Sequence, residues 1–408
     1  MDKFLDDLFA KRGSVREGAL SSIVDGLNFN YRRQFAGKNF ATLLYRCLNS
    51  FKKGSSKEIV LASRALGFLS ITVGCGDNAH ELYKESLPLI SQALKSRTES
   101  LLLSVIDCLA IATFIGANDF EETEASMQII WHFINLKPGD NVVVSKQSAS
   151  VLSAAISAWS LLLTTVDGWN LNHNYWQGAI PYFLDLLEVD DQCVCMVAGE
   201  AIALICEMGF LEKFAGNPTS DEIGSNEKGK NIKDRDYSIQ ELQEIVSNHA
   251  KRVSRQNSLQ SAATKTVNGW SNFSQNVLEA LEDGRFHEAS LKIGKHRLQL
   301  HSLSQVLQVN FIKRFLGRGF VPHMLENEFL HDVFNFTPRK QESGAELYSS
   351  EREEAVVHLF VPETRQLDGE DDFGRVQRPQ RSAFRKAKTQ LLNKQRMLKG
   401  EELRAYDD

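Results

Sequence analysis

Apolar residues in the first half of the chain recur every three or four positions, which is the spacing of one helix face. Four of these runs are rich in Ala and Leu, and each ends at a small or acidic turn: residues 61–69, 109–115, 154–159 and 201–206. The turns follow one another at roughly 40 to 50 residues, close to the armadillo/HEAT period. This pattern predicts an all-α, armadillo/HEAT-like helical repeat solenoid, which we favour over an irregular helical bundle.

Amphipathic stretches between these runs indicate the partner helices of each pair. Asp119 can cap a helix whose first turn holds Glu121 and Glu122. Pro88 lies inside the periodic stretch 80–95, so we expect that helix to kink or to begin near it. We expect no β-strand, because period-2 alternation is not sustained anywhere and the β-branched run at residues 142–144 is too short.

Helical spacing returns after a segment that is poor in apolar residues. Residues 216–238 are rich in Gly, Asn, Ser, Lys and Asp, which predicts a flexible loop. Residues 239–336 are then expected to form a second, C-terminal helical block that packs on the N-terminal solenoid of residues 1–215. Its central helix is expected within residues 298–315, and Gly317 and Gly319 suit the stop of that helix.

The remainder of the chain divides sharply by charge. Residues 340–374 hold ten acidic and three basic side chains, so residues 337–374 are predicted to be an acidic disordered linker. Residues 375–399 hold nine basic side chains and no acidic one. Ser382 can cap a helix about 25 Å long in this segment. Residues 375–408 are therefore predicted to be a basic tail helix.

On a helical wheel the tail helix presents one narrow apolar seam, and cations cover most of the remaining circumference. Such a helix cannot join a conventional core. It could lie along a phosphate backbone while its seam contacts protein or bases, or it could bind the acidic residues 368–372 of its own chain. The pattern leaves both readings open. The candidate RNA-binding and ribosome-binding residues are Arg385, Lys386, Lys388, Lys394, Arg396, Lys399, Phe384 and Leu391.

Motifs of the common catalytic and cofactor-binding classes are absent from the sequence. There is no Walker A sequence, no GxSxG elbow and no HExxH motif. Cys193 and Cys195 lack a second ligand pair at zinc spacing and are interpreted as buried structural thiols. We expect no catalytic residue, cofactor, metal, small-molecule substrate or membrane. Ser258, which follows a basic run, is a candidate phosphorylation site.

Net charge and cysteine content bear on the type of partner and on the cellular compartment. The formal net charge of -5 does not by itself indicate a nucleic-acid binder. No secretory signal precedes the six cysteines, so we expect reduced thiols in a reducing compartment. The uncharged run 147–166 is too polar for a membrane span and predicts a buried core helix.

Several short motifs resemble the interferon-related developmental regulator family. The N-terminal ones are Arg12-Gly13-Ser14 with Arg16-Glu17, residues 40–44, residues 52–55 and residues 72–76. The later ones are residues 315–320, residues 326–334 and residues 388–397, the last being similar to the tail of plant members. The resemblance covers most of the chain, whereas residues 213–269 match poorly.

The resemblance implies an armadillo-type helical fold and no catalysis. Animal members are described as transcriptional co-regulators, and one branch as ribosome-binding inhibitors of translation whose C-terminal helix enters the messenger RNA channel. We therefore expect a cytoplasmic regulator that binds the ribosome and its RNA through the basic tail and represses translation. The alternative is a transcriptional co-regulator that binds transcription-complex proteins, so a nuclear pool is also expected.

Overall fold

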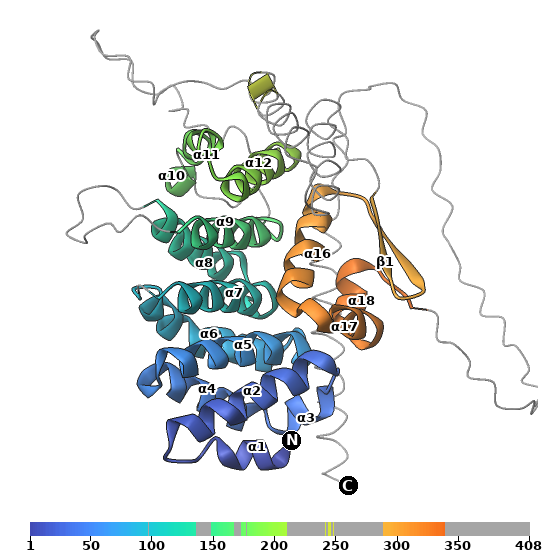
Figure 1. The fold of residues 1–408 in the computed structure, drawn as a ribbon. Coiled ribbons are helices and arrows are strands. Elements are labelled where there is room, and N and C mark those ends of the chain that lie inside the picture. Colours follow the sequence, from blue (N-terminus) through green and yellow to red (C-terminus); the bar gives the residue numbers. More distant parts are fainter. Residues whose placement is uncertain are drawn as a thin grey trace, which may run out of the picture.

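Helices of the N-terminal part stack in pairs to form a column, and a smaller C-terminal block lies against the side of that column (Figure 1). The computed structural model describes residues 1–96, 98–135, 148–166, 173–176, 178–209 and 289–338, together with residues 241, 244, 245 and 248. The helices of the column are α1 (Asp2–Asp7), α2 (Gly13–Phe29), α3 (Arg33–Lys38), α4 (Phe40–Lys53), α5 (Ser56–Val73), α6 (Asp77–Ala93), α7 (Glu99–Gly116), α8 (Phe120–Ile134), α9 (Ala149–Leu163), α10 (His173–Trp176), α11 (Ala179–Leu187) and α12 (Gln192–Glu207).

The column has an inner and an outer layer. In the inner layer α2, α5, α7, α9 and α12 pack side by side in that order, and α4, α6, α8 and α11 cover them from outside. The four Ala- and Leu-rich runs of the sequence lie in α5, α7, α9 and α12, as the repeat pattern predicted. The predicted all-α, armadillo/HEAT-like solenoid is therefore confirmed over the described helices.

Local signals set the ends of these helices. Ser55 caps α5 by accepting a hydrogen bond from the N–H of Glu58, and Gly74 ends it with a φ of 69°. Asp119 caps α8 through the N–H of Glu122, which confirms that prediction. Asp191 caps α12 in the same way.

Of the two alternatives given for Pro88, a kink or a helix start near it, the start is wrong. α6 begins at Asp77, directly after Gly76, and Pro88 lies inside it. Pro88 is exposed on the outer layer, where water can replace the one backbone hydrogen bond that a proline removes. Packing of the buried face of α6 on α7 therefore outweighs the local cost of the proline.

One apolar core runs through the described part of the column and into the C-terminal block. Trp159 and Trp176 are fully buried and pack against Trp131 in tilted and edge-to-face contacts. By length and composition α7 could cross a membrane, but 72% of it is buried among other helices, as expected of a central core helix. The uncharged run predicted to be a core helix forms α9, which is also largely buried.

The C-terminal block contains two strands as well as helices. Its elements are β1 (Ala289–Ile293), β2 (His296–Leu300), α16 (Leu303–Leu316), η2 (Gly317–Gly319), α17 (Phe320–Glu326) and α18 (Glu328–Phe334). The expectation of no strand is wrong here, and the central helix begins at Leu303 rather than at residue 298. Apolar and polar residues alternate on both sides of Gly294, and the apolar ones are Leu291, Ile293, Leu298 and Leu300. This is a hairpin pattern, which we had interpreted as part of a helix.

Candidate interaction surface

The C-terminal block docks on the inner layer of the column. α16 lies across α9 and α12, and its last turn reaches α7 and α5 (Figure 1). Phe315 packs its ring on Phe68 of α5, with ring centroids 4.9 Å apart. A Cβ atom at Gly67 would lie 2.5 Å from Cζ of Phe315. This contact therefore depends on the absence of a side chain at position 67.

Glu207, the last residue of α12, fixes the N-terminus of α16. Its carboxylate accepts hydrogen bonds from the backbone N–H groups of Leu303 and Ser304, at 2.8 and 3.2 Å. The Ser304 hydroxyl donates to the same carboxylate at 3.1 Å. Negative charge at a helix N-terminus is stabilised by the helix dipole, so α12 supplies a cap to a helix 96 positions later in the chain.

A buried hydrogen bond holds the middle of α16, and an ion pair holds its last turn. The Gln308 amide donates to the Thr164 hydroxyl at 2.9 Å, inside the interface. In the last turn the Arg314 guanidinium donates to both carboxylate oxygens of Asp107 on α7, at 3.2 and 2.7 Å. Burial raises the pKa of Asp107, and the charge of Arg314 offsets part of that rise.

Buried polar side chains fix the far end of the block. His323 of α17 has no exposed surface, and its Nε2–H donates to the carbonyl oxygen of Leu27 at 2.9 Å. Burial lowers the pKa of His323, because the charged imidazolium would lose its hydration. The Asn327 amide donates to the carbonyl oxygen of Ile71 at 2.9 Å, while its own oxygen caps α18 through the N–H of Phe329.

Motifs that suggested the family resemblance meet at this interface. Gly74, in the 72–76 motif, lies against Phe329 of the 326–334 motif, and a Cβ at Gly74 would be 3.2 Å from Cβ of Phe329. Gly319, in the 315–320 motif, packs so closely on the backbone of Asn28 that no Cβ fits. These motifs therefore encode contact between the two halves of the molecule.

Arg16, in the first N-terminal motif, binds a carboxylate on another helix. Arg16 of α2 donates two hydrogen bonds to the carboxylate of Glu58 on α5, at 2.9 and 2.8 Å. The Ser50 hydroxyl of α4 donates to the same carboxylate at 2.9 Å. Hydrogen bonding from Arg16 lowers the pKa of Glu58 against the opposing effect of burial. One buried carboxylate thus joins α2, α4 and α5.

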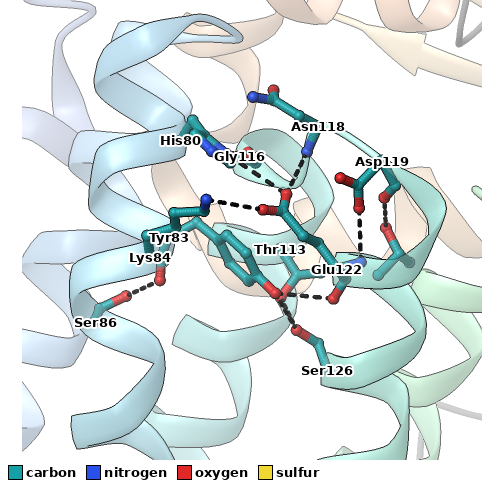
Figure 2. Close-up of polar contacts among 11 residues, drawn as sticks. His80, Tyr83, Lys84, Ser86, Thr113, Gly116, Asn118, Asp119, Glu122 and Ser126 are labelled. Carbon is teal, nitrogen blue, oxygen red and sulfur yellow. Dashed lines mark hydrogen bonds and ion pairs between the residues drawn. The ribbon is translucent and has the colours of Figure 1, made fainter.

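A polar network ties the successive helices α6, α7 and α8 together (Figure 2). The Tyr83 hydroxyl of α6 donates to the carbonyl oxygen of Glu122 at 2.8 Å, and burial raises its pKa to about 12. Thr113 of α7 donates to the Ser126 hydroxyl at 2.9 Å, and Ser126 lies 3.2 Å from the Tyr83 hydroxyl. The carboxylate of Glu122 lies 3.6 Å from Nζ of Lys84. The network therefore links α6, α7 and α8 through side-chain hydroxyl groups.

Potential metal ligands do not gather within the described residues, where no group of three His, Cys, Asp or Glu side chains could hold an ion. Cys195 is buried and lies 2.9 Å from the carbonyl oxygen of Val189. Cys193 is exposed, so the interpretation of both thiols as buried is wrong for this residue. It lies in the first turn of α12, where the apolar face is turned away from it.

The site residues predicted from the sequence lie outside the described residues. This applies to the whole basic tail, including Arg385, Lys386, Lys388 and Arg396, and to the candidate phosphorylation site Ser258. Their roles stay predictions. The boundaries at residues 215, 238, 336 and 374 also stay predictions.

Comparison with known families decides the class of protein. The family model described as "Interferon-related developmental regulator (IFRD)" matches residues 1–262. The chain belongs to this family. Its members in this comparison include mouse interferon-related developmental regulator 2, 25% identical over 88% of this chain and 77% of that protein. Human interferon-related developmental regulator 1 is 24% identical over 87% of this chain and 75% of that protein.

Three further proteins are similar to parts of this chain. An uncharacterized protein of Schizosaccharomyces pombe is 24% identical over 83% of this chain and 74% of that protein. A designed armadillo repeat protein superposes with a TM-score of 0.43, at 16% identity over 69% of this chain and 99% of that one. A HEAT-like repeats protein of Thermococcus onnurineus gives a TM-score of 0.40, at 14% identity over 68% of this chain and 86% of that one.

This interferon-related developmental regulator family member is thus a regulator with a helical repeat scaffold. The contacts that sequence reasoning missed are the docking contacts of α16, α17 and α18. Each of them joins residues far apart in sequence, so no local spacing could have revealed the partners. The glycine at position 67 and the Gly-x-Gly at positions 317–319 were the visible signals of close approach.

Proposed function

We propose that this chain is a non-enzymatic regulatory scaffold that binds the ribosome and represses translation through its basic C-terminal segment. The observation that supports the proposal is the run 375–399, with nine basic side chains and no acidic one. Ribosomal RNA is a dense phosphate surface, and a segment that neutralises several phosphates gains affinity by releasing counterions. The apolar positions Phe384 and Leu391 would contact protein or bases.

The docked body suits the role of an anchor for such a segment. Hydrogen bonds and the ion pair of Asp107 with Arg314 hold α16, α17 and α18 on the column. The described part of the block ends at Pro338, and 36 residues, 339–374, precede the basic run. A fully extended chain of that length spans at most about 130 Å, a length that would let the basic segment act away from the body.

The proposal is tested by sedimentation of cell extract on sucrose gradients. The variant replaces six tail cations by Gln: Arg385, Lys386, Lys388, Lys394, Arg396 and Lys399. We expect the wild type to migrate with ribosomes and the variant to stay near the top of the gradient. The salt dependence of ribosome binding should also flatten, with a log–log slope smaller by about 4 to 5 for six phosphate contacts.

A matched control replaces six exposed cations of the folded body by Gln: Lys3, Lys11, Lys38, Lys53, Lys95 and Lys313. This control has the same net charge as the tail variant, and it should still migrate with ribosomes. If wild type and tail variant sediment alike with the same salt slope, the tail has no part in ribosome binding.

A second candidate function is transcriptional co-regulation through protein partners in the nucleus. The repeat fold favours it, because stacked helix pairs offer a long surface for binding other proteins. This function predicts that nuclear partners remain bound after neutralisation of the tail. Absence of wild-type protein from the ribosomal fractions, together with such partners, would replace the ribosome proposal.

A further inference from the structure

The two strands of the C-terminal block form an antiparallel ribbon that lies on the far side of the block from α5, α7 and α9 (Figure 1). The register pairs Leu291 with Leu298 and Lys292 with Arg297. Leu298 and Ile293 point inward and are buried, as alternation along a strand requires. The outward face carries Ser290, Lys292, Arg297 and Gln299, all of them exposed.

Two cations stand directly opposite each other on this outward face. Ile293 and His296 flank the two-residue turn, so the next pair, Lys292 and Arg297, is of the non-hydrogen-bonded kind. Side chains of such a pair are closer together, and like charges placed there destabilise a sheet. Neither side chain forms an ion pair or a hydrogen bond with another described residue.

A third cation lies at the tip of the same ribbon. Lys295 is exposed in the turn, and residues 289–301 contain no Asp or Glu. Gly294, with a φ of 58°, is the first turn residue, which fits a type II′ turn. A Cβ there would lie 3.9 Å from both Val321 and Leu325 of α17. The tip is thus held on the block, and its cations face outward.

We propose that the outward face of this ribbon binds the phosphate backbone of RNA. A phosphate bound between Lys292 and Arg297 is attracted by both side chains and offsets the repulsion between them. Phosphate binding therefore explains a pair of like charges that would otherwise only destabilise the sheet. The face carries no apolar side chain, whereas attachment to a lipid surface also uses apolar insertion. The choice of RNA rests on the proposed ribosome binding, and the location of the site rests on the ribbon alone.

The first test measures binding of a short fluorescein-labelled RNA hairpin to the full-length protein by fluorescence anisotropy. The variant Lys292→Gln/Arg297→Gln should bind about fivefold or more weakly, and its salt slope should fall by about 1.4 to 1.8 for two lost phosphate contacts. The control Lys38→Gln/Lys95→Gln removes the same charge from exposed positions of the column and should change neither quantity. Equal behaviour of the two variants would overturn the proposal.

A single substitution separates binding from folding. Lys292→Glu places opposite charges across the strands, which should leave the melting temperature unchanged or raise it. The same change should weaken RNA binding more than Lys292→Gln does. RNA binding equal to that of the wild type would overturn the proposal. Arg297→Glu creates the same pair in the reverse direction and provides an independent second variant.

The tail variant of six neutralised cations distinguishes this inference from the ribosome proposal. RNA binding that survives in the tail variant and is lost on further change of Lys292 and Arg297 supports the ribbon, whatever the tail does. Binding that depends on the tail and ignores the ribbon leaves the ribosome proposal standing and overturns the ribbon site. Competition by polyglutamate as strong as by unlabelled RNA would overturn the assignment of RNA as the partner.

Discussion

The absence of a Cβ atom at Gly67 allows Phe315 of the C-terminal block to pack on α5 of the column. We predict that Gly67→Ala destabilises the protein by about 1 to 3 kcal/mol, although alanine is the better helix former. The reason is that the new Cβ would lie 2.5 Å from the Phe315 ring, which cannot retreat because it stacks on Phe68. Urea unfolding followed by circular dichroism measures the change.

Gly199→Ala is the matched control for that substitution. Gly199 also lies inside a helix of the inner layer, but its nearest neighbour would be Cδ2 of Leu187 at an ordinary 3.9 Å. There the higher helix propensity of alanine should stabilise the protein by about 0.5 to 1 kcal/mol. The same sign of effect at both positions would contradict the close packing of Phe315 on α5.

His323 should make the stability of the protein depend on pH. Because burial lowers its pKa below 6.5, the unfolded chain binds a proton at higher pH than the folded chain does. The contribution of neutral His323 to the free energy of unfolding is therefore fully present above the pKa of the unfolded chain. It is lost as the pH falls from about 6.5 towards the lower pKa of the folded chain. His323→Gln, which keeps an N–H for the Leu27 carbonyl, should remove this contribution.

The measurement is urea unfolding of wild type and variant between about pH 7.5 and about pH 5. The wild type should lose up to about 1.4 kcal/mol per pH unit more than the variant below about pH 6.5. His132→Gln, at an exposed histidine on α8, is the control and should follow the wild type. Parallel curves for all three proteins would show that His323 titrates alike in the folded and unfolded chains.

Individual residues were predictable from the sequence where their role is local. Asp119 could be recognised as a cap because its partner is three positions away. Arg16 could be noticed as part of a motif, but its partner Glu58 lies 42 positions away, and neither spacing nor charge singles out that pair. The buried state of His323 was equally invisible, since its acceptor lies 296 positions away.

At the scale of elements, α16 depends on a cap that another helix provides. We predict that Glu207→Gln weakens this cap by about 1 kcal/mol, because the amide loses the negative charge and one acceptor oxygen. The N–H groups of Leu303 and Ser304 should then exchange with solvent about fivefold faster, as measured by hydrogen exchange. Glu85→Gln on the exposed face of α6 should leave those amides unchanged.

Elements were predictable where their apolar face repeats over several turns. α5, α7, α9 and α12 each bury a long periodic face, so their spacing was a sufficient signal. The ribbon of β1 and β2 was missed because five residues per strand give too few repeats to separate period 2 from period 3.6. For α6, the sequence left a kink or a start near Pro88 as alternatives, and the start was wrong because packing of the buried face of α6 outweighs the proline.

At the scale of the whole molecule, the column and the C-terminal block form one structure with a continuous core. From the sequence we expected two helical parts, the second packed on the first, and their helical spacing was the signal for each part. The sequence did not predict that α16 would cross α9 and α12, or that the last turn of α16 would contact α5. That arrangement is set by shape complementarity at Gly67, Gly74 and Gly319, which emerges only in three dimensions.

The docking of the block has a consequence for how the chain is made. Ile71 belongs to α5, the fifth helix to be synthesised. Asn327, which donates a hydrogen bond to the carbonyl oxygen of Ile71, is synthesised 256 positions later. At a synthesis rate of about 5 to 20 residues per second, α5 is made roughly 13 to 50 seconds before the C-terminal block that packs on it. Throughout that interval the surface of α5 at Gly67 and Phe68 lacks its contact with Phe315, so the growing column exposes apolar side chains that chaperones bind.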